Sequence, residues 1–116
     1  MKIERIRKTA DFQDVLKNGK KVHGGKFSLY TKRDKSIKTA KAGVVIPKRF
    51  APKAAQRNYI RRVINATFRE HSASLDRGIL VVTRLSREVR DIKKRNLSKI
   101  IKEEIRKLFK KSGIIK

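Results

Sequence analysis

Hydrophobic and polar positions follow two different periods in the first third of this 116-residue chain. Phe12, Val15 and Leu16 recur at the three- and four-residue spacing of an amphipathic helix, which predicts a short helix from Thr9 to Asn18. From residue 22 to residue 32 the period changes to two, which is typical of a strand. We expect one face of this strand to carry Phe27, Leu29 and Thr31, and the other to carry Ser28, Tyr30 and Lys32.

Short apolar runs and one long helical pattern follow. Residues 42–46 predict a buried strand that ends at Pro47. Residues 79–83, after a turn at 76–78, predict a second apolar strand. The last helix is expected to begin around Arg90 and to end at Ser112-Gly113. Its apolar stripe consists of Leu97, Ile101, Ile105 and Leu108.

These elements predict a single domain over residues 1–116, because the chain has no internal repeat and no low-complexity linker. Their order is a helix, two or three strands, a helix, a strand and a helix. This order predicts an α+β fold with helices laid on a small sheet. Residues 1–8 are rich in Lys and Arg, and we expect them to form a mobile or loosely docked basic arm.

A further helix, expected from about residue 53 to residue 70 or 71, has two distinct faces. At about 100° per residue, one arc holds the core-type residues Ile60, Val63, Ile64, Thr67 and Phe68. The opposite arc holds Arg57, Asn58, Arg61, Arg62, Asn65 and Arg69. No acid occurs on this helix before Glu70, so its arginines are not neutralised within the helix. Guanidinium and amide groups arranged in this way suit phosphate, ribose and base-edge contacts; the alternative is a basic helix that serves solubility only.

The charge of the whole chain also favours a polyanionic partner. There are 34 Lys and Arg residues against 10 Asp and Glu, which gives a net charge of +24. Nucleic acid is therefore the first partner to consider, and an anionic membrane the second. No apolar run approaches the roughly 20 residues that span a bilayer, the N-terminal sequence lacks the apolar core of a signal peptide, and cysteine is absent. We therefore expect a protein of the cytoplasm, or of its equivalent in an organelle.

Catalysis by protein side chains is not expected. The two histidines, His23 and His71, fall on different elements, and neither has a carboxylate at a spacing that suggests an acid–base pair. No Asp, Glu or His cluster resembles a protein metal site. Gly24-Gly25 lacks the helix and lysine of a phosphate-binding loop. The sequence favours a binding protein.

Two aromatic residues are candidates for stacking on unpaired bases, a contact worth about 1–3 kcal/mol per base. Tyr30 shares its strand face with Ser28 and Lys32, so we expect its ring to be exposed. Phe12 fits equally well as a stacking residue and as the core anchor of the first helix. Phosphate contacts are expected from three loop residues, Lys48, Arg49 and Lys53.

The run Arg57-Asn58-x-x-Arg61-Arg62 resembles the signature of the protein subunits of bacterial ribonuclease P, usually Arg-Asn-Arg-x-Lys/Arg-Arg-x-x-Arg. The similarity extends along the chain. Residues 9–16 resemble the first helix of that family, residues 26–30 its first strand, and residues 43–49 its strand and basic loop before the signature. Residues 79–82 and the last helix complete the order.

This resemblance implies a fold, a function and partners. The fold is a two-layer α+β sandwich, α-β-β-β-α-β-α, with a four-stranded sheet and a left-handed crossover, similar to the second domain of ribosomal small-subunit protein five. The family's catalyst is an RNA, and the protein subunit helps it to remove the 5′ leader from precursor tRNA. Mg²⁺ is held mainly by the RNA subunit and the substrate. The implied partners are ribonuclease P RNA and precursor tRNA, with no membrane and no obligate protein partner.

The resemblance also assigns roles to residues. The signature helix faces the catalytic RNA with Arg57, Asn58, Arg61 and Arg62. A cleft between the first helix and the sheet holds the single-stranded leader, and the matching positions are Phe12, Leu16 and Tyr30. Three positions depart from the pattern: Tyr59 and Asn65 replace arginines, and Leu16 replaces a second cleft aromatic. We expect Arg69 to supply part of the missing charge.

Two other functions stay open. A structural ribosomal RNA-binding protein would share the size, the charge and the lack of a catalytic set. A basic DNA-binding module is a third hypothesis, although no recognition-helix arrangement is recognisable.

Overall fold

The computed structural model describes residues 3–71, 75 and 78–113. In this part of the chain three helices and five strands form an α+β fold, which confirms the predicted fold class. The strands are β1 (Ile3–Arg5), β2 (Lys20–His23), β3 (Phe27–Arg33), β4 (Ala40–Val45) and β5 (Ile79–Leu85). The helices are α1 (Thr9–Asn18), α2 (Ala54–Glu70) and α3 (Lys94–Ser112).

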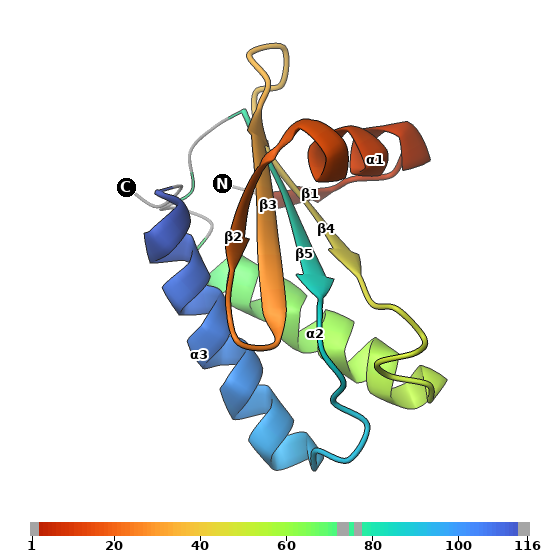
Figure 1. Cartoon of the computed structure of the whole chain (residues 1–116). Coiled ribbons are helices and arrows are strands. Elements are labelled where there is room, and N and C mark those ends of the chain that lie inside the picture. The colour runs from red at the N-terminus through yellow and green to blue at the C-terminus, as the bar shows by residue number, and fades with distance from the viewer. Residues whose placement is uncertain (1–2, 72–74, 76–77, 114–116) are drawn as a thin grey trace.

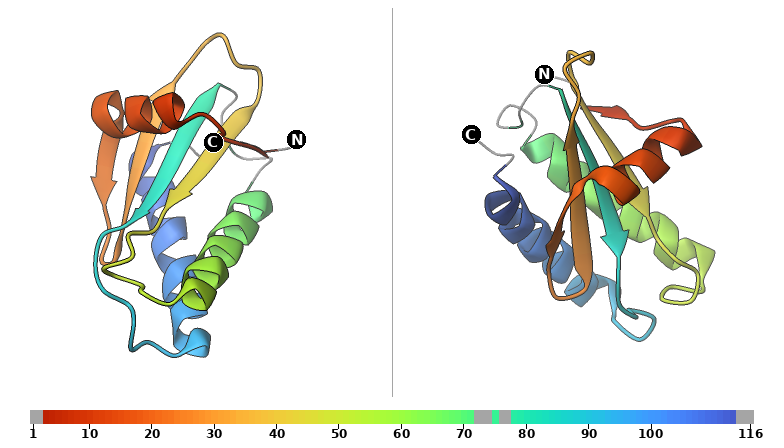
Figure 2. Two further views of the ribbon diagram at one scale, coloured as in Figure 1. Left: turned by 90° about the vertical axis from the view of Figure 1, so that its right-hand side faces the viewer. Right: turned by 45° about the horizontal axis from the view of Figure 1, so that its top comes forward.

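The strands form one mixed sheet in the order β1-β4-β5-β3-β2. β4 is parallel to both β1 and β5, whereas β3 is antiparallel to both β5 and β2. Helix α1 covers one face of the sheet, and α2 and α3 lie side by side on the other face (Figures 1 and 2). The molecule therefore has three layers, and the expected two-layer arrangement is wrong.

The third layer exists because β3 and β5 are buried on both faces. Below α2 and α3, the core contains Phe27, Leu29, Val81 and Leu85. Below α1, a second core contains Tyr30, Leu80 and Val82, packed against Val15 and Ile6. The strand face that sequence alternation suggested to be polar is thus covered by a helix.

The sheet has five strands instead of the expected four because of β1. Ile3 to Arg5 pair in parallel with Ala40 to Ala42, and the Ile6 N–H continues the ladder by donating to the Ala42 carbonyl at 3.0 Å. Part of the expected arm, residues 1–8, is therefore an edge strand. The sequence did not predict β1 because three residues are too few to show the two-residue period of a strand, and because the strand it pairs with lies far along the chain.

Two element boundaries also differ from the sequence-based expectation. The alternating segment 22–32 is divided between β2 and β3, and Glu104 of α3 accepts hydrogen bonds from the N–H groups of Lys26 and Phe27 where β3 begins, at 2.6 and 3.2 Å. Helix α3 begins at Lys94 because the preceding segment is bound to the loop before α2, where the Val89 N–H donates to the Phe50 carbonyl at 3.0 Å.

The expected turn at 76–78 falls mostly outside the described residues, since residues 76 and 77 are not among them. Gly78, which is described, has a φ of 74°, a left-handed conformation that favours glycine.

Candidate nucleic-acid interface

Helix α2 separates apolar and basic residues as its sequence predicts. Ile60, Ile64 and Phe68 are buried against the sheet and α3. Each such side chain contributes about 1.5–3 kcal/mol when fully buried, which fixes the rotation of the helix about its axis. Arg61, Arg62 and Arg69 consequently stand on the exposed side.

A groove of about 360 Å³ lies between α1 and α2, at the edge of β4. We call it the α1–α2 groove. Six of its lining residues were predicted site residues: Phe12, Asn58, Arg61, Arg62, Asn65 and Arg69. The others are Arg5, Ile6, Ala42, Gly43 and Val44. The fold thus brings the signature helix and one predicted leader-binding aromatic to the same concave surface.

The floor of the groove is formed where β4 extends beyond β1. The pairing between these strands ends at Ala42, so Gly43 and Val44 form an open sheet edge. The ring of Phe12 packs against Gly43, at a position where a β-carbon would clash with it. Glycine is therefore needed at position 43 for α1 to approach the sheet this closely.

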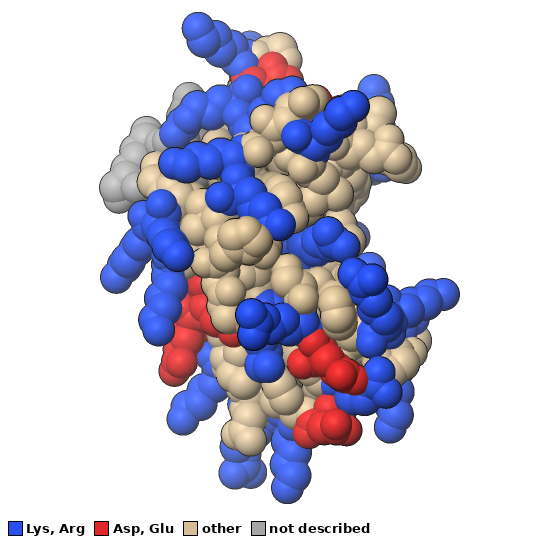
Figure 3. All heavy atoms as spheres, viewed as in Figure 1, with Lys and Arg blue, Asp and Glu red and all other residues tan. Residues whose placement is uncertain are grey.

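The groove differs from the rest of the surface in its chemistry. Lys and Arg side chains spread over much of the face shown in Figure 3, so positive charge alone does not mark a site. The α1–α2 groove combines four arginines, two asparagines and a phenylalanine, and none of its described lining residues is acidic. Guanidinium, amide and aromatic groups together can contact phosphates, base edges and base faces.

Arg5 is a groove residue that sequence reasoning did not identify. It lies at the end of β1, is exposed, and reaches the groove because β1 pairs with β4. Within the sequence it is one of several basic residues near the N-terminus, with no motif or period to distinguish it.

Tyr30 and Leu16 do not line the α1–α2 groove. The Tyr30 side chain is only 6% exposed and packs beneath α1, so the expectation of an exposed ring is wrong. The ammonium group of Lys21 lies 5.3 Å from its ring centroid. Leu16 is partly buried in the same cluster. Of the three residues predicted for a leader-binding cleft, Phe12 alone reaches the groove.

Arg57 does not line the groove either, although it begins the signature. Its Nη1 donates to the carbonyl oxygens of Ala51 and Pro52, at 2.9 and 2.8 Å. The guanidinium therefore holds the loop that leads into α2. On this loop Lys48, Arg49 and Lys53 are exposed, and the Arg49 guanidinium stacks 4.7 Å from the Phe50 ring centroid. These three residues form a basic surface separate from the groove lining.

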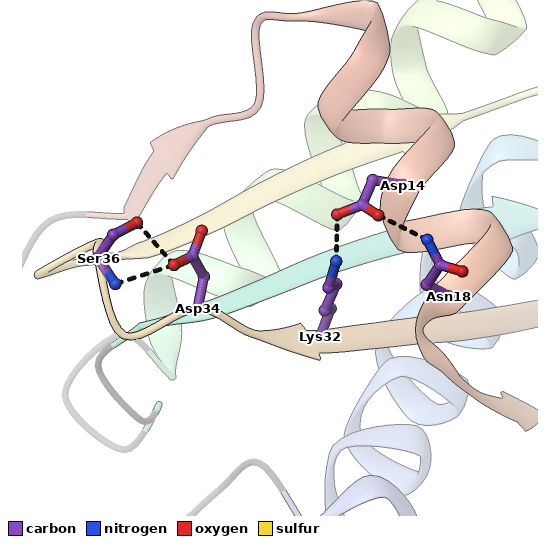
Figure 4. Close-up of polar contacts among 5 residues, drawn as sticks. All are labelled: Asp14, Asn18, Lys32, Asp34 and Ser36. Carbon is purple, nitrogen blue, oxygen red and sulfur yellow. Dashed lines mark hydrogen bonds and ion pairs between the residues drawn. The ribbon is translucent and has the colours of Figure 1, made fainter.

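An ion pair ties α1 to the sheet beside Phe12. Asp14 on α1 pairs with Lys32 on β3 and accepts a second hydrogen bond from Asn18 at 2.7 Å (Figure 4). The hydrogen bond from Lys32, followed by that from Asn18, lowers the pKa of the Asp14 carboxyl. Hydrogen bonds from Ser36 similarly lower the pKa of Asp34, in the β3–β4 turn. The Asp14 contact helps to set the position of α1, and with it one wall of the groove.

The described residues contain no group of three or more His, Asp or Glu side chains that could hold a metal ion. Among them there is also no helix long and apolar enough to cross a membrane.

A basic α+β domain with an arginine-lined groove and an open sheet edge has the site chemistry of a nucleic-acid-binding protein. The chain matches the family model of Ribonuclease P over residues 1–113. It belongs to this family, and its function is that of the RNA-binding protein subunit of ribonuclease P, which works with the ribonuclease P RNA in tRNA processing.

Individual relatives agree with this assignment. The chain is 33% identical to the ribonuclease P protein component of a Staphylococcus epidermidis strain and 36% identical to that of Staphylococcus carnosus, in each case over 84 residues and 72% of both chains. Its fold is similar to that of the ribonuclease P protein from Staphylococcus aureus, with a TM-score of 0.84 at 24% identity over 99% of this chain and 100% of the other. The corresponding protein from Thermotoga maritima gives a TM-score of 0.74 at 22% identity, over 93% and 96%.

Proposed function

We propose that this chain assists a catalytic RNA in removing the 5′ leader from precursor tRNA, and that the α1–α2 groove holds the single-stranded leader. The observation that carries the proposal is the shared groove, which Phe12 and the arginines of α2 line together. A single strand exposes base faces that a duplex does not, and Phe12 offers a surface for stacking. Arg5 and Arg69, which line the same groove, neutralise the adjacent phosphates of the leader.

In this proposal Tyr30 and Leu16 support the groove from beneath and do not touch the leader. Tyr30 on β3 packs under α1, and Leu16, on α1 itself, is partly buried in the same cluster as Phe12. Their contribution is to hold the first helix at the height where the Phe12 ring meets Gly43. This assignment differs from the family resemblance, which places all three side chains against the leader.

The exposed side of α2 docks on the RNA subunit. Asn58, Arg61 and Arg62 lie on this side, followed one turn later by Asn65 and then by Arg69. Asn65 stands where the family usually has an arginine, and Arg69 and Arg5 line the same groove. Arg69 and Arg5 supply the positive charge that is lost where Asn65 stands in place of an arginine.

Bond cleavage belongs to the RNA, with Mg²⁺ held mainly by the RNA subunit and the substrate. The protein's positive groove screens the repulsion between two polyanions, the catalytic RNA and the precursor. Because Mg²⁺ would otherwise have to provide this screening, the protein lowers the Mg²⁺ concentration that cleavage requires.

Cleavage of precursor tRNA by purified bacterial ribonuclease P RNA at low Mg²⁺ tests the proposal. We expect the protein to raise the cleavage rate, and Phe12→Ala to weaken binding of leader-bearing precursor while leaving mature tRNA almost unaffected. Lys17→Gln, an exposed change on the same helix, is the control. An unchanged rate on addition of the protein, together with its recovery in the ribosome fraction, would favour a structural ribosomal protein instead.

A further inference from the structure

The outer side of α3 carries a continuous row of cations. Arg95, Lys99, Lys102, Arg106 and Lys110 recur every three or four residues. At 100° and 1.5 Å per residue they fall within an arc of about 80° and extend over about 22 Å. We call this row the α3 stripe. The buried side of the same helix holds Leu97, Ile101, Ile105, Leu108 and Phe109.

The α3 stripe is separate from the α1–α2 groove, since none of its residues lines that groove. Arg106 Nη2 lies 3.2 Å from Glu70 Oε2, which places the stripe along the side of α3 nearest α2. On the other side of α3, Lys111 donates to the His23 carbonyl at 3.2 Å. Helices α2 and α3 together cover the sheet face opposite α1 (Figure 2). The stripe is thus a second basic surface, on the helix that lies beside α2 in the same layer of the fold (Figure 2).

In the described part of the chain the cations of the α3 stripe outnumber the acids beside them: Glu70 pairs with Arg106, and the exposed Glu103 lies four residues after Lys99. Among its five residues, Arg106 has an ion-pair partner within the described part of the chain, and the other four have none there. Like charges at a spacing of four residues destabilise a helix, and the stripe contains three such pairs in one row. The first turn of α3 has no acidic residue, so Arg95 also lies near the positive end of the helix dipole. A polyanion bound along the stripe would remove these unfavourable interactions.

We propose that the α3 stripe binds the phosphate backbone of double-helical RNA without regard to sequence. Lys and Arg on a straight, rigid helix suit a row of phosphates. Stacking on unpaired bases needs an exposed aromatic side chain, and the aromatic residue of α3, Phe109, is fully buried. The stripe therefore fits a duplex backbone, in contrast to the groove with its Phe12 ring. The inference rests on the RNA partner of the proposed function and is independent of leader binding.

Two variants with the same loss of charge test the proposal. The stripe variant combines Arg95→Gln, Lys99→Gln, Lys102→Gln and Lys110→Gln. The control variant combines Lys17→Gln, Lys35→Gln, Lys38→Gln and Lys107→Gln, which are exposed positions on three different segments. Arg106 is kept in both variants because of its ion pair with Glu70. The substitutions lie at exposed or half-buried positions, and circular dichroism verifies that both variants are folded.

The measurement is binding to a blunt RNA duplex of uniform sequence over a range of salt concentrations. Each phosphate contact contributes about 0.7–0.9 to the slope of log affinity against log salt. We expect the stripe variant to lose about 3 from this slope and the control variant less than about 1. A triple variant with Lys99→Arg, Lys102→Arg and Lys110→Arg should retain the slope. Equal losses in the stripe and control variants would overturn the proposal, because diffuse charge would then explain the binding.

Further measurements distinguish duplex binding by the α3 stripe from binding in the α1–α2 groove and from binding to a lipid surface. The stripe variant should bind single-stranded leader RNA within about threefold of the unmodified chain, a ratio below 1 kcal/mol. If Arg61→Ala abolishes duplex binding while the stripe variant retains it, the duplex lies in the groove and the proposal is wrong, whatever the leader result. A loss confined to vesicles of anionic phospholipid, with duplex binding intact, would also overturn it.

Discussion

The ring of Phe12 lies against the backbone of Gly43, so closely that a β-carbon at position 43 would stand 2.5 Å from Phe12 Cζ. This contact joins α1 to β4 at the floor of the α1–α2 groove. It explains why a glycine with an ordinary strand conformation is required there: the constraint is space for the ring and not backbone torsion.

We predict that Gly43→Ala forces the Phe12 ring or the whole of α1 to move. Overpacking of this kind typically costs about 1–3 kcal/mol. The free energy of unfolding from urea titration should fall by that amount, and binding of leader RNA should weaken. The double variant Gly43→Ala with Phe12→Ala should recover part of the loss relative to the two single changes, since the clash is gone. Additive losses would show that the contact does not limit the approach of α1. Gly25→Ala, with neighbours at 3.5 Å, serves as the control.

Phe12 and Tyr30 should respond differently to substitution, because Phe12 lines the groove and Tyr30 does not. Phe12→Ala should reduce the affinity for a leader-bearing precursor about 5- to 150-fold, the equivalent of about 1–3 kcal/mol of lost stacking. Tyr30→Phe should leave that affinity within about twofold, since the ring stays packed beneath α1. Binding of precursors with and without a leader measures both effects. A strong, leader-specific defect in Tyr30→Phe would place its hydroxyl in contact with the leader.

The Asp14–Lys32 pair should make the docking of α1 dependent on pH. The Lys32 hydrogen bond, and after it that of Asn18, holds the folded-state pKa of Asp14 below the ordinary value of 3.8. A group whose pKa is lowered by folding stabilises the protein above its unfolded-state pKa and loses this contribution as the pH falls through the folded-state value. Asp14→Asn should therefore melt at a lower temperature than the unmodified chain at pH 6, and the difference should shrink as the pH falls below 3.8 and through the lowered folded-state pKa of Asp14.

Asp34, whose pKa is also lowered, is present in both proteins, so the comparison isolates Asp14. Asp11→Asn removes a carboxylate from the same helix without breaking the pair and should not reproduce the pH dependence. A melting difference that stays constant from pH 6 to well below pH 3.8 would contradict the assignment.

Glu104 should matter more for stability than its neighbour Glu103. Its carboxylate accepts hydrogen bonds from the N–H groups of Lys26 and Phe27 and so binds α3 to the β2–β3 hairpin. Hydrogen bonds to charged groups contribute about 1.5–3 kcal/mol, so Glu104→Ala should lower the free energy of unfolding, measured by urea titration, by an amount in this range. Glu103→Ala, at an exposed position, should change stability by less than about 0.5 kcal/mol. Equal effects would show that the hairpin does not depend on the carboxylate.

The sequence predicted well those features that depend on the residue pattern of a single helix or strand. Burial of Ile60, Ile64 and Phe68 orients α2, so the exposure of Arg61 and Arg69 follows from the period of one helix. The apolar stripe of α3 is buried for the same reason.

What the sequence could not predict depends on contacts between distant segments. Alternation in β3 shows that Tyr30 and Leu29 point to opposite faces, but it does not show that α1 covers the face of Tyr30. Likewise, Arg5 becomes a groove residue through the pairing of β1 with β4, in which Arg5 lies opposite Ala42. Such placements follow from topology, which no local period encodes.

Arg57 changes how mutational data on the signature should be interpreted. Because its guanidinium is committed to the Ala51 and Pro52 carbonyls, a variant at this position alters the path of the chain into α2 before it alters any intermolecular contact. A loss of activity in Arg57→Ala would therefore report misplacement of the neighbouring cations. Within one short motif, Arg57 thus has a structural role, whereas Arg61 lines the groove. Substitution of each arginine distinguishes these roles only when the folding of each variant is measured together with its RNA affinity.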